Sequence, residues 1–146
     1  MDVFTQIVTN KCIYVPVCLW FVVQVLKIII EYIKTRKINF RRLVGAGGMP
    51  SSHSAIVCAL ASCVGKEYGI GSGIFAVALI FAFVVMYDAT GVRRAAGKQA
   101  SILNKMLETP QMTSIQVQEK LVELLGHTPI QVFVGAILGF VVGYIF

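Results

Sequence analysis

Two histidines, His53 and His127, are the residues of this chain that could most readily do chemistry. His53 follows a run of glycine, proline and serine over residues 45–52, and His127 is followed by Thr128 and Pro129. The free N–H groups and the dipole of a helix that begins at such a run favour a bound anion. The same composition is also that of an ordinary helix start, with proline in the first turn and a hydroxyl cap. Locally, both interpretations are open.

Cationic residues stand in segments that could join the histidines. Arg93 and Arg94 follow a long apolar stretch, and the glycine-rich run directly precedes His53. Cationic donors for phosphate oxygens, one nucleophile and one general acid are the parts that phosphoryl transfer needs. The sequence therefore predicts a phosphate site if the fold brings these parts to one end of the molecule.

The composition indicates where such a site would lie. Hydrophobic residues make up 57% of the 146 residues and charged residues only 14%, whereas a soluble domain carries about 25% charge. These values exclude a disordered chain, a fibrous protein and a disulfide-rich secreted module, and predict a protein surrounded mostly by lipid. The net charge of +6 is interpreted as basic residues flanking membrane spans, with no nucleic acid partner, because aromatic residues do not alternate with the basic runs.

Apolar stretches predict an all-α integral membrane protein, a helical bundle of about four transmembrane helices forming a single membrane domain. A helical span needs about 20 apolar residues. Two shorter helices are expected in the segment 88–128, one from Val92 to about Glu108 and one from about Ile115 to Leu125. The expected spans cover residues 12–33, 49–65, 70–87 and 129–146.

The basic residues also predict an orientation. They concentrate in residues 31–50 and 88–129, which a four-span topology places on the same side. Because positive charge favours the cytoplasmic side, we expect both segments there, in a bacterial cytoplasmic membrane. Lys27, Glu31 and Lys34 share one helix face at the end of the first span, either as a snorkelling Lys–Glu pair or as a cationic wall of the site.

Glycines recur every four residues in two places, a spacing that lets helices approach closely in lipid. In the last span this pattern predicts a packing face that could also join two copies of the chain in a homo-oligomer. Near residues 65–73 the pattern fits either packing or a turn. The glycines concerned are Gly135, Gly139 and Gly143 in the span, and Gly65, Gly69 and Gly73 near the turn.

Several motifs together resemble the type-2 phosphatidic acid phosphatase superfamily, which includes the vanadium haloperoxidases. Residues 50–53, Pro-Ser-Ser-His, resemble its P-S-G-H motif, and residues 127–139 resemble its final His-x3-Asp motif running into a span. Lys34 and Arg41 have the K-x6-R spacing of its first motif. The sequences of residues 47–55, 87–100 and 124–129 resemble those of a small divergent branch, the acid phosphatase/vanadium-dependent haloperoxidase-related proteins.

The resemblance implies a role for each matching residue. His127 matches the nucleophile that forms a phosphohistidine, and His53 matches the general acid that protonates the leaving oxygen. The implied chemistry needs no metal and no cofactor, and vanadate would bind as a phosphate mimic. The expected phosphate-binding residues are Lys34, Arg41, Gly47, Gly48, Ser51, Ser52, Arg93 and Arg94.

The sequence departs from the superfamily pattern beside the nucleophile. Leu121 stands where the motif has its arginine, a loss that Arg93 or Arg94 could offset. Gln131 stands where an aspartate would orient His127, and it can accept a hydrogen bond but brings no charge. Asp88 either holds Arg93 or Arg94 in place, serves as the missing carboxylate, or is simply solvated at the membrane interface.

The resemblance implies a membrane phosphatase for lipid phosphates, either monoesters or diphosphates, whose partners are membrane lipids and a phosphorylated lipid substrate. One alternative is a protein that binds or transports a phospholipid or polyprenyl phosphate without hydrolysing it. Another is a small helical subunit of a larger membrane complex. The missing carboxylate partner of His127 separates the first two interpretations.

Overall fold

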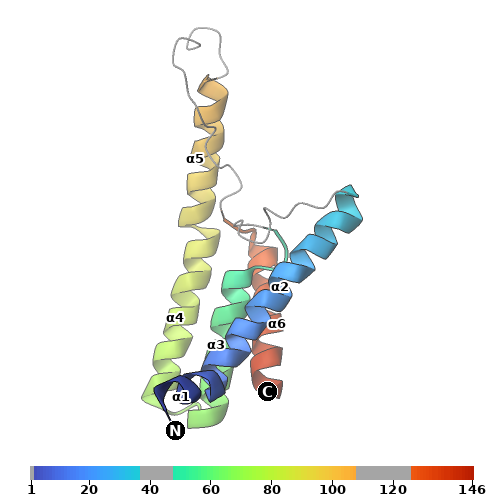
Figure 1. Cartoon of the computed structure of the whole chain (residues 1–146). Helices are drawn as coiled ribbons and strands as arrows, with labels where there is room; N and C mark the ends of the chain where they lie inside the picture. Colours follow the sequence, from blue (N-terminus) through green and yellow to red (C-terminus); the bar gives the residue numbers. More distant parts are fainter. Residues whose placement is uncertain (1, 37–47, 108–125) are drawn as a thin grey trace.

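The computed structural model describes residues 2–36, 48–107 and 126–146, without the side chains of residues 93, 94 and 107. All regular structure in these residues is helical, which confirms the all-α prediction (Figure 1). The helix α5 matches the first of the two predicted connecting helices, whereas the second, over residues 115–125, lies outside the described residues. The helices are α1 (Val3–Thr9), α2 (Lys11–Thr35), α3 (Ser52–Tyr68), α4 (Gly73–Thr90), α5 (Val92–Leu107) and α6 (Pro129–Ile145).

Local sequence determines where these helices begin and end. The side chains of Ser51 and Thr128 accept hydrogen bonds from the backbone N–H groups of the first turns of α3 and α6, as N-caps do. Gly69 ends α3 with a φ of 83°, a conformation that glycine adopts without strain. A side chain at Gly69 or Gly73 would meet no neighbour, so neither glycine belongs to a packing face: Gly69 lies in the turn after α3, and Gly73 begins α4.

Helix α3 is the centre of the bundle and packs against α2, α4 and α6. Its closest partner is α6, because a Cβ atom at Gly135, Gly139 or Gly143 would overlap the backbone of α3. The carbonyl groups facing these glycines belong to Ser51, Ala55 and Ala59. Both sets repeat every four residues, as in close helix pairs within lipid.

The glycine face of α6 is therefore occupied within one chain. Within one chain α3 fills the space in front of Gly135, Gly139 and Gly143, and a homo-oligomer joined through these glycines stays a prediction.

Much of the apolar surface faces outward. Within the described residues, α2 and the stretch from α4 into α5 contain windows long and apolar enough to cross a membrane, and only 33% and 17% of these windows is buried. Soluble monomers rarely expose apolar patches of this extent. Helix α6 is apolar but 17 residues long. The expected crossing of the membrane by α3 and α6 stays a prediction.

The helix ends separate the molecule into two poles. The C-terminal end of α2, the starts of α3 and α6 and the junction of α4 with α5 lie at one pole, and both chain termini lie at the other (Figure 1). His53 and His127 are at the starts of α3 and α6 and so share the first pole, which we call the site pole. Helix α5 continues the direction of α4 beyond this pole.

A single methyl group tests the contact between α3 and α6. We expect Gly139→Ala to destabilise the protein by about 1–3 kcal/mol, as overpacking usually does, because its Cβ would overlap the Ala55 carbonyl. Gly73→Ala is the matched control, since its Cβ would meet nothing. Thermal unfolding in detergent measures both, and equal melting temperatures for the two variants would contradict this packing.

Candidate functional site

The two histidines form a pair at the site pole. The centroids of the His53 and His127 rings are 5.8 Å apart, with the ring planes inclined by 65°. Backbone hydrogen bonds hold the segments that carry them. The N–H of Ser51 donates to the Gln131 carbonyl at 3.0 Å, and the N–H of His127 donates to the Ala89 carbonyl at 2.9 Å. The starts of α3 and α6 and the end of α4 are thus tied together around the two rings.

The cap of α6 determines which nitrogen of His127 carries the proton. The backbone N–H of Thr128 donates to Oε1 of Gln131 at 3.0 Å, which identifies the atom facing it as the amide oxygen. The same oxygen lies 3.3 Å from Nδ1 of His127. Because an oxygen can only accept, Nδ1 is the protonated nitrogen, and Nε2 keeps its lone pair.

His127 is poised as a neutral base. Its side chain is only 2% exposed, and no described residue forms a hydrogen bond with Nε2. The residue precedes α6 and lies outside the apolar helix. Burial lowers its pKa from 6.5 to about 4; the charges of Lys27 and His53 add to this effect, and the hydrogen bond to Gln131 and the nearby Gly48 backbone oppose it. At neutral pH the imidazole is therefore uncharged, as a nucleophile must be.

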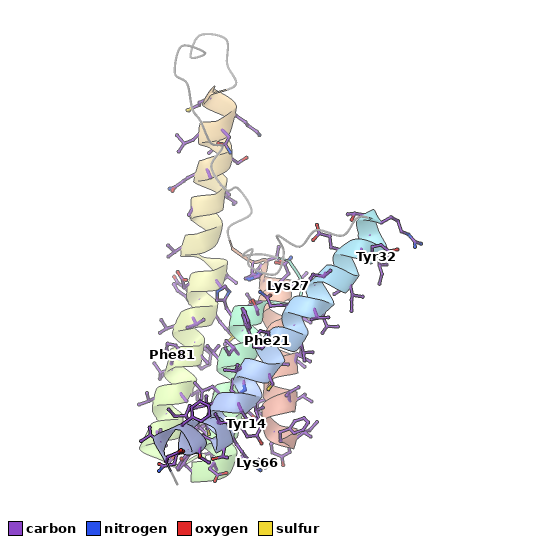
Figure 2. All side chains as sticks on the ribbon, viewed as in Figure 1. Tyr14, Phe21, Lys27, Tyr32, Lys66 and Phe81 are labelled. Carbon is purple, nitrogen blue, oxygen red and sulfur yellow. The ribbon has the colours of Figure 1, made fainter. Side chains whose placement is uncertain are left out.

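Lys27 is a buried cation beside the histidines. Its side chain is 4% exposed, and Nζ donates to Oγ of Ser52 at 3.0 Å. Figure 2 shows Lys27 at the site pole and Lys66 at the opposite one. The inward position excludes snorkelling of Lys27 and leaves the cationic wall as the interpretation of this helix face. Lys27 is not among the phosphate-binding residues expected from the sequence, although its spacing to Lys34 pointed to this face.

A polar cavity of about 260 Å³ opens between α2 and the start of α6. It is lined by Lys27, Lys34, Gly48 and Gln131 among other residues, and Lys34 is exposed at its rim. Within the described ranges His, Cys, Asp and Glu side chains do not gather in groups of three or more. Glu31 also lines this cavity, so its two ammonium groups and one carboxylate leave a net charge of +1, which suits an anion.

The serines before His53 have different surroundings. Ser51 is fully buried, and its Oγ accepts hydrogen bonds from the N–H and the hydroxyl of Ser54 at 3.3 and 3.0 Å. Its hydroxyl thus caps α3, the ordinary interpretation of this motif. The Ser52 hydroxyl accepts from Lys27 and lies beside the cationic side of the site.

The remaining predicted residues are divided between described and undescribed parts. Asp88, at the end of α4, lines one cavity together with His53. Gly48 has a φ of 85°, and its Cβ position would lie 3.9 Å from the Lys27 stem. Arg41, Gly47, Leu121 and the side chains of Arg93 and Arg94 lie outside the described residues, so their roles stay predictions.

Comparisons with known proteins indicate the family of this chain. The model of a family described as the divergent PAP2 family matches residues 8–142. The uncharacterized membrane protein YuiD of Bacillus subtilis (strain 168) is 46% identical over 127 residues, which cover 80% of each chain. No solved structure matches the chain. The relative and the exposed apolar helices identify a membrane protein, and the match over most of its length shows that the chain belongs to the divergent PAP2 family.

Proposed function

We propose that this protein is a phosphatase for membrane lipid phosphates, monoesters or diphosphates, that acts through a phosphohistidine on His127. One observation carries the proposal: a buried, neutral imidazole whose Nδ1 is protonated presents an unbonded Nε2 next to a second imidazole and a buried ammonium. Nucleophile, general acid and cation are the groups that phosphoryl transfer uses.

In the first step, the Nε2 lone pair of His127 attacks phosphorus and the bond from phosphorus to the leaving oxygen breaks. His53, in its protonated form, gives its proton to that oxygen, so the lipid leaves as an alcohol or, from a diphosphate, as a monophosphate. Lys27 and Lys34 lie on the side of the polar cavity, where their charges stabilise the phosphate oxygens in the transition state.

In the second step, water attacks the phosphohistidine. His53, now neutral, accepts a proton from this water, the bond between phosphorus and Nε2 breaks, and inorganic phosphate leaves. Both imidazoles return to their starting protonation states. The reaction consumes one water for each ester or diphosphate bond.

Gln131 fulfils part of the role of the missing carboxylate. An orienting aspartate fixes the tautomer of a catalytic histidine and stabilises its cation. Gln131 can fix the tautomer because Thr128 holds its amide oxygen toward His127, but a neutral amide adds no charge. We therefore expect His127 to have the correct tautomer for a nucleophile but to react slowly.

The loss of charge at Gln131 favours a second candidate function, the binding or transport of a phosphorylated lipid without hydrolysis. For both candidates we propose four spans formed by α2, α3, α4 and α6. The basic segments and the site then face the cytoplasm, following the positive-inside rule.

Histidine substitutions separate the two candidates. With purified protein in detergent and a panel of lipid phosphates, His127→Ala should abolish phosphate release because it removes the nucleophile. His53→Ala should lower the rate by roughly 10²- to 10⁴-fold, the usual contribution of a general acid. Wild-type binding of vanadate without any turnover would favour the binder, and unchanged release by His127→Ala would exclude the proposed mechanism.

Lysine substitutions test the cationic side. Lys27→Met keeps an apolar stem and removes the charge, and should weaken vanadate binding by about 10- to 100-fold, the range for a lost charge-assisted hydrogen bond. Lys34→Met should have a smaller effect because Lys34 is exposed. Lys66→Met is the distant control, since its ammonium binds carbonyls at the end of α6. Equal binding by the Lys27 and Lys66 variants would contradict the role of Lys27.

The protonation of His127 gives a pH test. In His53→Gln only one histidine remains, so its imidazole NMR signals in detergent report His127 alone. The midpoint should lie well below 6.5, toward 4, and Lys27→Met should raise it because a nearby positive charge is removed. Since the unfolded chain binds this proton near 6.5, His127 stabilises the fold above that pH, and the contribution is lost as the pH falls from 6.5 to about 4. A midpoint at or above 6.5 would contradict the buried, neutral state.

A further inference from the structure

A second, larger cavity adjoins the histidine pair. Its volume is about 700 Å³, and it lies between α2, α3 and α4. Apart from His53 and Asp88, every residue that lines it carries a hydrocarbon or sulfur side chain. The volume is within the range of about 300–1,000 Å³ that is usual for small-molecule sites.

The two polar residues mark one end of this cavity. His53 is in the first turn of α3, and Asp88 is in the last turn of α4, both at the site pole. From His53 the lining continues to Leu60 on α3, and from Asp88 to Phe81 on α4. Seven residues of helix correspond to about 10 Å, so the apolar part extends about 10 Å from the histidines along the bundle.

The chemistry of the proposed reaction connects this cavity with the substrate. In phosphoryl transfer the attacking and leaving atoms lie roughly in line on opposite sides of phosphorus. Lys27 and Gln131, the partner of His127, line the polar cavity, whereas His53 lines the apolar one. A general acid must lie within hydrogen-bond reach of the leaving oxygen, which places that oxygen at the His53 end of the apolar cavity.

We infer that the cavity between α2, α3 and α4 binds the hydrocarbon chain of the leaving group, while the phosphate lies on the side of Lys27. The inference rests on the proposed function and specifies its substrate as a phosphate carried on an extended hydrocarbon chain. The charges agree with this orientation, because the Asp88 carboxylate lies at the chain side, whereas the polar cavity, lined by Lys27, Lys34 and Glu31, has a net charge of +1 that attracts a phosphate.

Another apolar cavity provides an internal comparison. It has a volume of about 310 Å³ and lies between α3, α4 and α6, lined by Leu79, Met86 and Ile137 among other residues. Neither histidine lines it. A hydrocarbon chain drawn only by apolar surface would enter either cavity, whereas one attached to a phosphate at the histidines enters only the first.

Photocrosslinking tests this assignment without requiring turnover. The probe is decyl phosphonate with a diazirine at the end of its chain, because its carbon–phosphorus bond resists hydrolysis. Crosslinked peptides of the detergent-solubilised protein are identified by mass spectrometry with and without vanadate. We expect vanadate-sensitive crosslinks at the lining residues of α2, α3 and α4, such as Val17, Leu60 and Phe81.

A matched pair of variants sharpens the test. Val84 lines the cavity, and Val77, on the same helix, does not; both side chains are largely exposed, at 60% and 70%. Val84→Trp should fill the cavity and abolish the vanadate-sensitive crosslinks, whereas Val77→Trp should leave them unchanged. Vanadate binding measured separately should persist in both variants, which shows that the site pole has kept its fold.

Other outcomes would overturn the inference. Crosslinks in the cavity that vanadate does not reduce would indicate an ordinary bilayer lipid. Vanadate-sensitive crosslinks between α3, α4 and α6, or an equal loss in Val77→Trp, would exclude this cavity as the chain site. Phosphate release from decyl phosphate without vanadate-sensitive crosslinks would exclude this cavity as the chain site but would leave the proposed hydrolysis standing. Vanadate-sensitive crosslinks in the cavity without any phosphate release would support the cavity and contradict the proposed hydrolysis.

Discussion

The close contact of α6 with α3 is the constraint on which the site depends. Three glycines of α6 face carbonyl groups of α3 with no space for a side chain, so the two backbones are in direct contact in this register. That register aligns the helix starts, so that Ser51 can donate to the Gln131 carbonyl and the two histidine rings meet at 5.8 Å. In lipid, where apolar side chains gain little by leaving their surroundings, such close backbone packing is a main source of helix association.

The cap of α6 adds the second constraint. A capping box normally satisfies the free N–H groups at a helix start, and here the same glutamine oxygen also accepts from Nδ1 of His127. One local motif thus begins the helix and selects the tautomer of the imidazole. Burial then keeps that imidazole neutral, since the charged form would lose its hydration.

Features that depend on residues near in sequence could be predicted. The histidines at helix starts, the helix α5 and the close-packing role of the α6 glycines follow from composition and spacing. Features that depend on tertiary placement could not. The inward position of Lys27 depends on where α2 crosses the start of α3. If α2 packed differently, the Lys27 side chain could instead extend to the membrane surface.

Two further points show the same limit. Glycine spacing predicts a close contact but does not say whether the partner is another helix of the same chain, and here it is α3. From the sequence, a glutamine at position 131 in place of the motif aspartate suggests that the group orienting His127 is lost. In the structure, the backbone N–H of Thr128 holds the Gln131 side-chain oxygen beside Nδ1 of His127. Compared with an aspartate, Gln131 lacks only the negative charge. In the proposed mechanism it can therefore orient the His127 ring, but it cannot stabilise the positive charge that forms on that ring.

The central claim is that His127 becomes covalently phosphorylated. The most direct measurement is rapid mixing of the purified protein with a lipid phosphate that it hydrolyses, alkaline quenching to preserve phosphohistidine, and mapping of the modified residue by mass spectrometry. The account predicts a transient phosphoryl group on His127 that appears before free phosphate and is absent from His53. Phosphate release with no phosphoryl group on His127, or with the group on His53, would contradict it.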